Sequence, residues 1–195
     1  MAAFLGNLRN VVIASFVLAI LLVGVYCGTQ GFDGMAFELF VLRWLHIVAG
    51  VMWIGLLWYF NFVQIPTVPK IEPAEHRAAV SKYIAPSALW WFRYGALATV
   101  VTGLLLASMN GYILQALTLR AGTVAIGIGM WLALIMAFNV WFIIWPNQQK
   151  ALGLVEVKAE DKPAAARIAM LASRTNTMLS IPMLFCMVAQ QNAGL

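Results

Sequence analysis

The histidine at position 46 is the residue of this sequence best suited to hold a cofactor. It lies in the stretch RWLHIVAGVMWIG, residues 43–55, where Arg43 and His46 stand at the mouth of a long apolar run. His46, Gly50 and Trp53 follow one another at positions i, i+4 and i+7, on one face of a helix. A flat tetrapyrrole edge-on to this face would bind His46 through its iron and meet Arg43 with a propionate. The pattern fits a haem b site in which His46 is the metal ligand and Gly50 leaves space.

A structural role explains the same residues. Arg and Trp are common anchors at the membrane interface, and a histidine at a helix mouth can donate to a neighbouring carbonyl. The only other histidine, His76, stands between Glu75 and Arg77 in a polar stretch. A haem held by two histidines of this chain is therefore excluded, whereas a five-coordinate haem, or one with a ligand from a partner chain, is not. In either role we expect His46 to face the bundle interior or a partner, because an unpartnered imidazole in hydrocarbon is costly.

Further polar side chains fall within or at the ends of apolar segments, namely Arg93, Asn139, Asn147 and Asn176. Ionisable and polar residues in membrane helices are often functional, and an asparagine there also bonds to a neighbouring helix. For Asn139 both roles remain open. Cys27 and Cys186 form neither a CxxC nor a zinc pattern, so they are interpreted as small buried hydrophobic residues.

The composition is that of an integral membrane protein. Of the 195 residues, 63% are hydrophobic and 10% are charged, and the mean hydropathy is +0.88, whereas soluble domains carry about 25% charged residues. A spanning helix needs about 20 mostly apolar residues. Five segments qualify, namely residues 10–27, 37–63, 89–109, 119–145 and 168–189. The sequence therefore predicts an all-α bundle of about five transmembrane helices in a single membrane domain, residues 1–195.

Basic residues indicate the orientation of this bundle. One side carries Arg43 and Arg120, both at helix mouths. The other side carries Arg9, Lys70, Arg77, Lys82, Lys150, Lys158, Lys162 and Arg167. The positive-inside rule then predicts a cytoplasmic N-terminus and a periplasmic C-terminus. Residues 73–85, which begin at Pro73 and stop before Pro86, are expected to form an amphipathic helix on the cytoplasmic surface.

Small residues recur every four positions in two of the apolar segments. They are Gly95, Thr99, Gly103 and Ala107 in one, and Ala121, Ala125, Gly129, Ala133 and Ala137 in the other. This spacing lets two helices approach closely in lipid. We therefore expect segments 89–109 and 119–145 to pack against each other.

Four stretches of the chain, taken together, resemble the membrane domain of the cytochrome c-linked urate oxidase (urate hydroxylase) family. They are RWLHIVAGVMWIGLLWYF, WWFRYGALATVVTGLLL, FNVWFIIWPNQQK and NTMLSIPMLFCMV, in this order between residues 37 and 190. The residues that match its motifs are Arg43, His46, Trp53, Gly55, Asn139, Pro146, Asn147 and Gln148. Where the family has histidines, this chain has Thr175 and Gln191, and it contains no CxxCH motif. The resemblance implies a short stand-alone member that lacks the cytochrome c domain.

The resemblance also implies a place in a redox membrane. The first interpretation is an accessory subunit of an electron-transfer-linked, respiratory or redox complex of the bacterial inner membrane, holding a haem b. Its partners would be other membrane subunits and lipid. One alternative is a small membrane redox enzyme of the urate oxidase type that uses a separate cytochrome c. A second is a transporter-like module, which the lack of an inverted repeat and of acidic residues inside the segments disfavours. The net charge of +5 is explained by the basic residues on the predicted cytoplasmic side of the membrane, so no nucleic-acid partner is expected.

Overall fold

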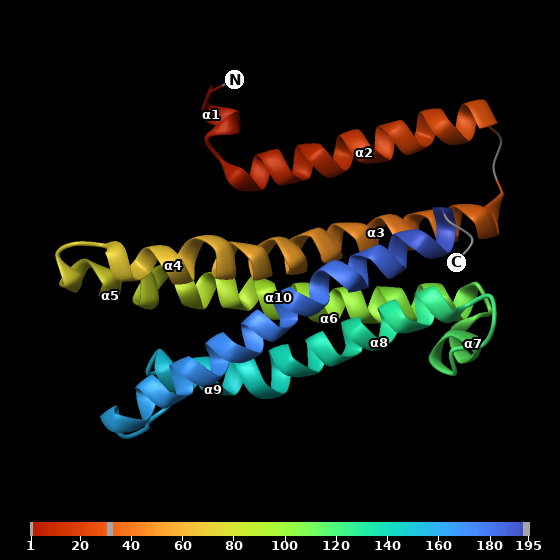
Figure 1. Ribbon diagram of the computed structural model, residues 1–195. Coiled ribbons are helices and arrows are strands. Elements are labelled where there is room, and N and C mark those ends of the chain that lie inside the picture. The colour runs from red at the N-terminus through yellow and green to blue at the C-terminus, as the bar shows by residue number, and fades with distance from the viewer. Residues whose placement is uncertain (1, 31–32, 193–195) are drawn as a thin grey trace. The chain divides into compact units, whose positions relative to one another are not determined.

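The structure, a computed structural model, describes residues 2–30 and 33–192 (Figure 1). Within these ranges every regular element is helical, and the expected all-α membrane fold is confirmed. The chain divides into two compact units, Met1–Phe40 and Val41–Leu195, which are described separately.

The first unit contains two helices and the start of a third. They are α1 (Ala2–Leu5), α2 (Leu8–Gln30) and the first turns of α3 (Gly34–Trp58). Asp33 begins α3, because its Oδ1 accepts from the backbone N–H groups of Met35 at 3.0 Å and Ala36 at 3.2 Å, a typical N-terminal cap. The side chains of α2 are apolar and largely exposed, as expected of a helix that contacts lipid.

Four helical stretches within the described ranges are long and apolar enough to cross a membrane. They are Leu8–Thr29, Gly34–Lys70, Ala74–Met109 and Val124–Ala151. The fifth predicted segment, 168–189, lies in α10 (Lys162–Asn192) and does not qualify. Arg174 and a series of serine, threonine and asparagine side chains lower the mean hydropathy of α10. Its crossing, like the orientation of the termini, therefore remains a prediction.

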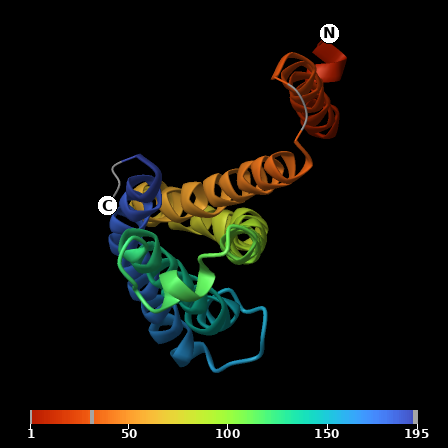
Figure 2. The same cartoon turned by 90° about the vertical axis from the view of Figure 1, so that its right-hand side faces the viewer.

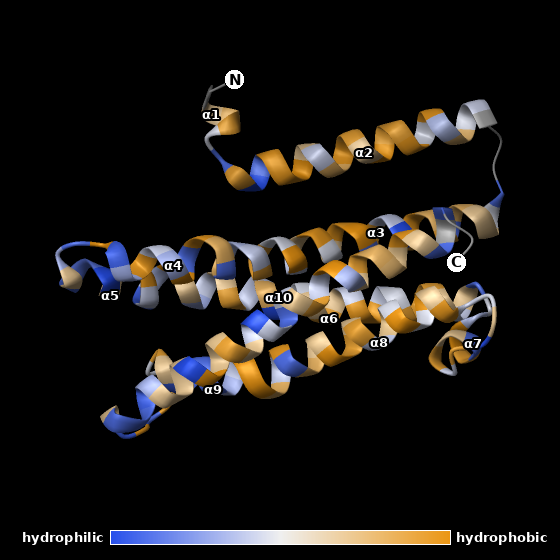
Figure 3. Cartoon of the chain, in the orientation of Figure 1, coloured by the Kyte–Doolittle hydropathy of each residue, from blue (hydrophilic) through white to orange (hydrophobic). Residues whose placement is uncertain are grey.

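The second unit is a bundle in which the direction of the chain alternates from helix to helix (Figures 1 and 2). It is formed by α3, α6 (Ala85–Met109), α8 (Val124–Phe138) and α10. The connections 71–73 and 152–158 lie at one end, where hydrophilic residues gather (Figure 3). The short helix α7 (Ile113–Leu117) lies at the other end, together with the last turns of α10. The centre is filled by Trp53, Leu57, Phe92, Met136 and Val140.

Three of the long helical stretches contain a π-helical turn near the end of the bundle where connections 71–73 and 152–158 lie. The turns are η1 (Tyr59–Gln64), η4 (Val80–Ile84) and η5 (Asn139–Ile144), and each is followed two residues later by a proline. A proline has no N–H for the carbonyl four residues earlier and crowds it. For Pro66, Pro86 and Pro146 that carbonyl lies inside the preceding π turn, so widening the helix there accommodates the ring.

The π turns explain why residues 73–85 do not form a separate surface helix. The stretch begins with η3 (Ala74–His76) and α5 (Arg77–Ala79), and continues through η4 into α6. The expected stop at Pro86 does not occur, because the π turn absorbs the missing hydrogen bond. A second correction concerns residues 119–123, which form a turn with Leu119 and Gly122 at positive φ, so that the helix starts at Val124 instead of position 119.

The segments 89–109 and 119–145 contact each other through α6 and α8, as expected, but three glycines of the small-residue stripes lie closest to other helices. A Cβ on Gly95 would lie 3.2 Å from the backbone nitrogen of Trp53, and one on Gly103 would lie 2.8 Å from Cε1 of His46. Gly129 faces α10, where a Cβ would lie 3.1 Å from Cβ of Cys186. The glycines of segment 89–109 thus contact α3, and Gly129 of segment 119–145 contacts α10. Ala125 is half-buried on α8.

Candidate cofactor site

A cavity of about 620 Å³ lies inside the second unit, between α3, α6, α8 and α10. Its volume falls in the range of about 300–1,000 Å³ that is typical of small-molecule and cofactor sites. All four residues that the sequence singled out as cofactor-binding line it, namely Arg43, His46, Gly50 and Trp53. These four residues therefore lie on the face of α3 that is turned toward the cavity, and their role in binding a cofactor stays a prediction.

The imidazole of His46 is held by α6 through one of its two nitrogens. Nδ1 lies 3.0 Å from the carbonyl oxygen of Thr99 and 3.1 Å from Oγ1 of Thr102. Because a carbonyl oxygen only accepts, Nδ1 of the neutral ring carries the proton and donates it, which leaves the lone pair on Nε2. The ring edge lies against Gly103, where a Cβ would not fit. The orientation of His46 is thus fixed by three residues of one neighbouring helix.

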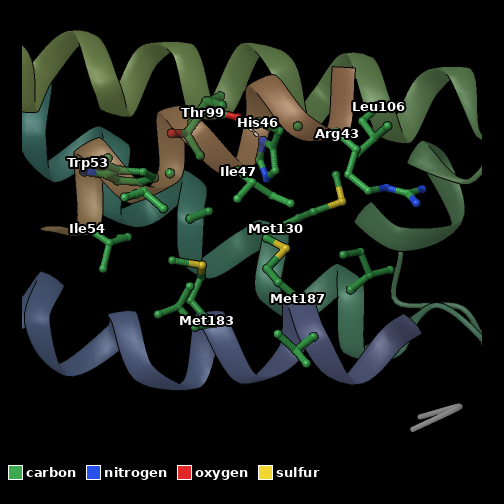
Figure 4. Close-up of a pocket in the computed structure, with 18 of the residues that line it drawn as sticks. Arg43, His46, Ile47, Trp53, Ile54, Thr99, Leu106, Met130, Met183 and Met187 are labelled. Carbon is green, nitrogen blue, oxygen red and sulfur yellow. Dashed lines mark hydrogen bonds between the residues drawn. The ribbon is translucent and has the colours of Figure 1, made fainter. Parts of the chain in front are cut away.

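The other side of the cavity is lined by thioethers from α8 and α10. Figure 4 shows His46 on α3 with Met130 and Met187 across from it, and Met183 one turn further along α10. Nothing in the sequence alone pointed to these methionines, because Met in an apolar helix is more often a flexible core filler. Within the described residues no group of three or more His, Cys, Asp or Glu gathers. Among the His, Cys, Asp and Glu side chains of the described residues, only His46 lines the cavity.

Arg43 gives the cavity a positive end. Its Nε is buried and has no hydrogen-bond partner, and its guanidinium extends away from His46 in Figure 4. The phenol of Tyr112, which follows α6, lines the same cavity. Burial raises the pKa of Tyr112, and the nearby Arg43 charge offsets part of this rise. An anionic group of a bound ligand would find donors here.

Trp53 is buried completely against the core. Its Nε1 has no hydrogen-bond partner, and in Figure 4 this nitrogen lies on the side of the ring that is turned away from His46. Gly50 leaves the adjoining wall open, because a Cβ there would only touch Thr99 Cγ2 at 3.9 Å. Trp53 therefore supplies an apolar wall, and Gly50 supplies space.

A polar contact between helices lies outside the cavity, in the half of the bundle with the π turns. Asn139 in η5 donates through Nδ2 to Oδ1 of Asn176 at 2.8 Å, and Asn176 donates to the carbonyl oxygen of Met136 at 2.9 Å. Asn176 is fully buried. Of the two roles left open for Asn139, this geometry favours joining η5 to α10.

The contact between Asn139 and Asn176 leads to the first prediction. Replacing Asn176 with Ala is expected to lower the free energy of unfolding by about 1–3 kcal/mol, because the Asn139 amide and the Met136 carbonyl lose their buried partner. Thr175→Ala is the matched control: Thr175 is exposed and bonds only to Leu171 of its own helix, so a change of about 0.5 kcal/mol or less is expected. Thermal unfolding in detergent measures both variants. Equal stabilities of the two would show that the asparagine pair does not join the helices.

The remaining intramembrane polar residues do not reach the cavity. Asn147 donates to Ile143 of its own helical stretch at 2.8 Å. Arg93 stacks on Trp145 of α9 (Trp145–Ala151), with 3.3 Å between Cζ and the ring centroid. Two further contacts were not anticipated: Trp58 donates to Oγ of Ser180 at 3.0 Å, and Asn61 donates to Oγ of Ser173 at 2.8 Å. The polar side chains along α10 were the only feature of the sequence that could have indicated these two contacts.

The helices and the cavity define a class of protein, namely a multi-pass, all-α membrane protein whose bundle contains a largely apolar, partly open pocket of cofactor size. The profile of the family described as "Urate oxidase N-terminal" matches residues 108–193. This segment contains α7, α8, η5, α9 and most of α10, and it is the part of the chain that is similar to the urate oxidase N-terminal family. The match begins after α3, so the correspondence of Arg43, His46, Trp53 and Gly55 rests on their own sequence motif. No curated protein and no solved structure matches the chain.

Proposed function

We propose that this chain is a urate-oxidase-type membrane module that holds one haem b at His46 and serves as an accessory subunit of an electron-transfer complex in a bacterial inner membrane. The observation that carries the proposal is the hydrogen bonding of the His46 imidazole. Nδ1 donates to a backbone carbonyl, while Nε2 is free to ligate inside a cavity of cofactor size. Histidines that bind metals typically donate their second ring N–H in this way.

The cavity is lined by the types of residue that a haem needs, namely an imidazole, a guanidinium and apolar side chains. His46 would ligate the iron, Arg43 would pair with a propionate, and the apolar walls of α8 and α10 would cover the macrocycle. Bound there, haem would supply one-electron transfer. The chain's own contribution is to orient the imidazole through Thr99 and Thr102, to neutralise carboxylate charge through Arg43 and to exclude water. His46 would thus be the histidine of this chain that holds the group.

Purification from the native membrane in a mild detergent tests the proposal in one experiment. We expect a Soret band with about one haem per chain. We also expect the chain, of 21.4 kDa, to migrate in a larger particle whose other subunits can be identified. A chain that migrates alone would contradict the subunit role. A preparation without haem that also takes up none when haem is added would contradict the cofactor role.

A further inference from the structure

Arg93 is a charged residue of α6 whose hydrogen-bonding capacity is largely unused. Its Nε donates to the carbonyl oxygen of Leu89 at 3.3 Å. Its guanidinium stacks on Trp145, and Cζ also lies 5.6 Å from the ring centroid of Trp141. The ion pairs among the described residues are Arg77 with Glu72 and Lys158 with Glu160, so no carboxylate there neutralises Arg93. The terminal N–H groups of its guanidinium remain available.

The ring of Trp141 lies beside Arg93, but its N–H is not accessible to a ligand. Nε1 of Trp141 is buried and has no hydrogen-bond partner, and the ring of Tyr94 packs edge-on against Trp141 with centroids 5.7 Å apart. Trp141 therefore contributes its ring to the surroundings of Arg93, while the guanidinium of Arg93 is the group that can donate to a ligand. A charged side chain in a membrane helix is costly without a partner, and a guanidinium matches the fork of a phosphate. The missing group is an oxyanion.

The depth of Arg93 in the membrane identifies the source of this oxyanion. Arg93 precedes Met109, the last residue of α6, by 16 positions, which is about 24 Å along an α-helix. The hydrocarbon core is about 30 Å thick. If Met109 marks the far boundary, Arg93 lies about 6 Å inside the near one, and its side chain can reach the headgroup level. Trp145 lies 21 positions after Val124, about 32 Å, and so at the same boundary.

The surroundings of Arg93 match that boundary. Trp90, Trp91 and Tyr94 are exposed on α6 and contact one another, with Trp90 and Tyr94 centroids 4.7 Å apart. Tryptophan and tyrosine concentrate where the hydrocarbon meets the headgroups. Lys82 in η4 and Lys150 in α9 add positive charge at the same end of the bundle. The surface around Arg93 is therefore aromatic and cationic, which selects a lipid with net negative charge.

We propose that Arg93, stacked on Trp145, binds the phosphate of an anionic phospholipid. The lipid belongs to the leaflet at the end of the bundle with connections 71–73 and 152–158. Its phosphate accepts from the guanidinium, and its acyl chains lie along the apolar surface between α6 and η5. The site is separate from the cavity at His46 and does not depend on haem.

The test compares two lipids on the purified chain and its variants. Phosphatidylglycerol should bind and raise the melting temperature, and phosphatidylcholine should do neither. Arg93→Gln should weaken the affinity for phosphatidylglycerol about tenfold or more, since charge-assisted hydrogen bonds are lost. Arg174→Gln is the matched control: Arg174 is exposed on α10 and precedes Asn192 by 18 positions, about 27 Å, so that charge and depth are similar. Its affinity should change about twofold or less.

Three outcomes would overturn the proposal. The first is an equal response of the parent chain to phosphatidylglycerol and phosphatidylcholine, which needs no variant and so remains informative if Arg93→Gln does not fold. The second is an affinity of Arg93→Gln for phosphatidylglycerol that equals the affinity of the parent or of Arg174→Gln. The third is a stabilisation by inorganic phosphate as large as the one by the lipid, which would mean that the site takes a soluble anion. Native mass spectrometry of retained lipid measures the first two directly.

Discussion

Replacing His46 with Ala is expected to abolish haem binding by this chain. Among His, Cys, Asp and Glu, only His46 lines the described wall of the cavity, so its loss would remove the residue that is proposed to ligate the iron. The matched control is His76→Ala, since His76 lies on an exposed turn at the end of the bundle. Both variants remove one imidazole. The Soret absorbance per chain should vanish in the first and stay unchanged in the second.

The stability of the two variants separates ligation from structure. His46→Ala also removes the hydrogen bond to Thr99, which contributes about 1 kcal/mol, so the unfolding of haem-free protein should be measured alongside the spectra. A His46 variant that retains the full Soret band would show that the iron is held elsewhere. A variant that is less stable and takes up no haem, like a haem-free parent, would leave His46 with its structural role alone.

Replacing Gly127 with Ala is expected to destabilise the fold by about 3 kcal/mol, at the upper end of typical overpacking costs. A Cβ there would overlap the carbonyl oxygen of Ala116 in α7 and lie 2.8 Å from Cδ2 of Leu119. The first of these neighbours is backbone, so α7 itself would have to shift. Thermal or denaturant unfolding in detergent measures the loss.

Gly55 provides the control for Gly127. A Cβ on Gly55 would meet nothing within 4 Å, and alanine is a better helix former than glycine by about 1 kcal/mol. Gly55→Ala should therefore leave the stability unchanged or raise it, whereas Gly127→Ala should lower it. If Gly127→Ala were as stable as Gly55→Ala, α7 would not be packed against α8 in the membrane.

The helices could be predicted from the sequence far better than their contacts. Hydropathy and length identify apolar segments, because the bilayer imposes both. A stripe of small residues predicts a close approach, but it does not specify the neighbour, and Gly95 and Gly103 face α3 instead of α8. A proline after a polar stretch predicts a helix end, whereas Pro86 is accommodated by η4 within a continuous helical stretch.

Only the wall of the candidate site that contains His46 could be predicted from the sequence. An imidazole at the mouth of a membrane helix needs a partner, so the inward orientation of His46 follows from physical cost. The opposite wall could not be predicted, because Met130 and Met187 lie far from His46 in sequence and carry no distinctive pattern. The same holds for Arg93: its charge was recognisable, but the stacking on Trp145 depends on how α6 and α9 meet.

The distribution of the π turns divides the bundle into two mechanically different halves. η1, η4 and η5 all lie toward the end with connections 71–73 and 152–158, each beside a proline. There the hydrogen-bond ladders of three stretches are widened, and such places are where helices bend. Around His46 the ladders of α3, α6 and α8 are uninterrupted. We therefore expect α3, α6 and α8 to bend more readily at the end with the π turns than beside His46, whereas α10 has its own break at Pro182, next to the cavity wall.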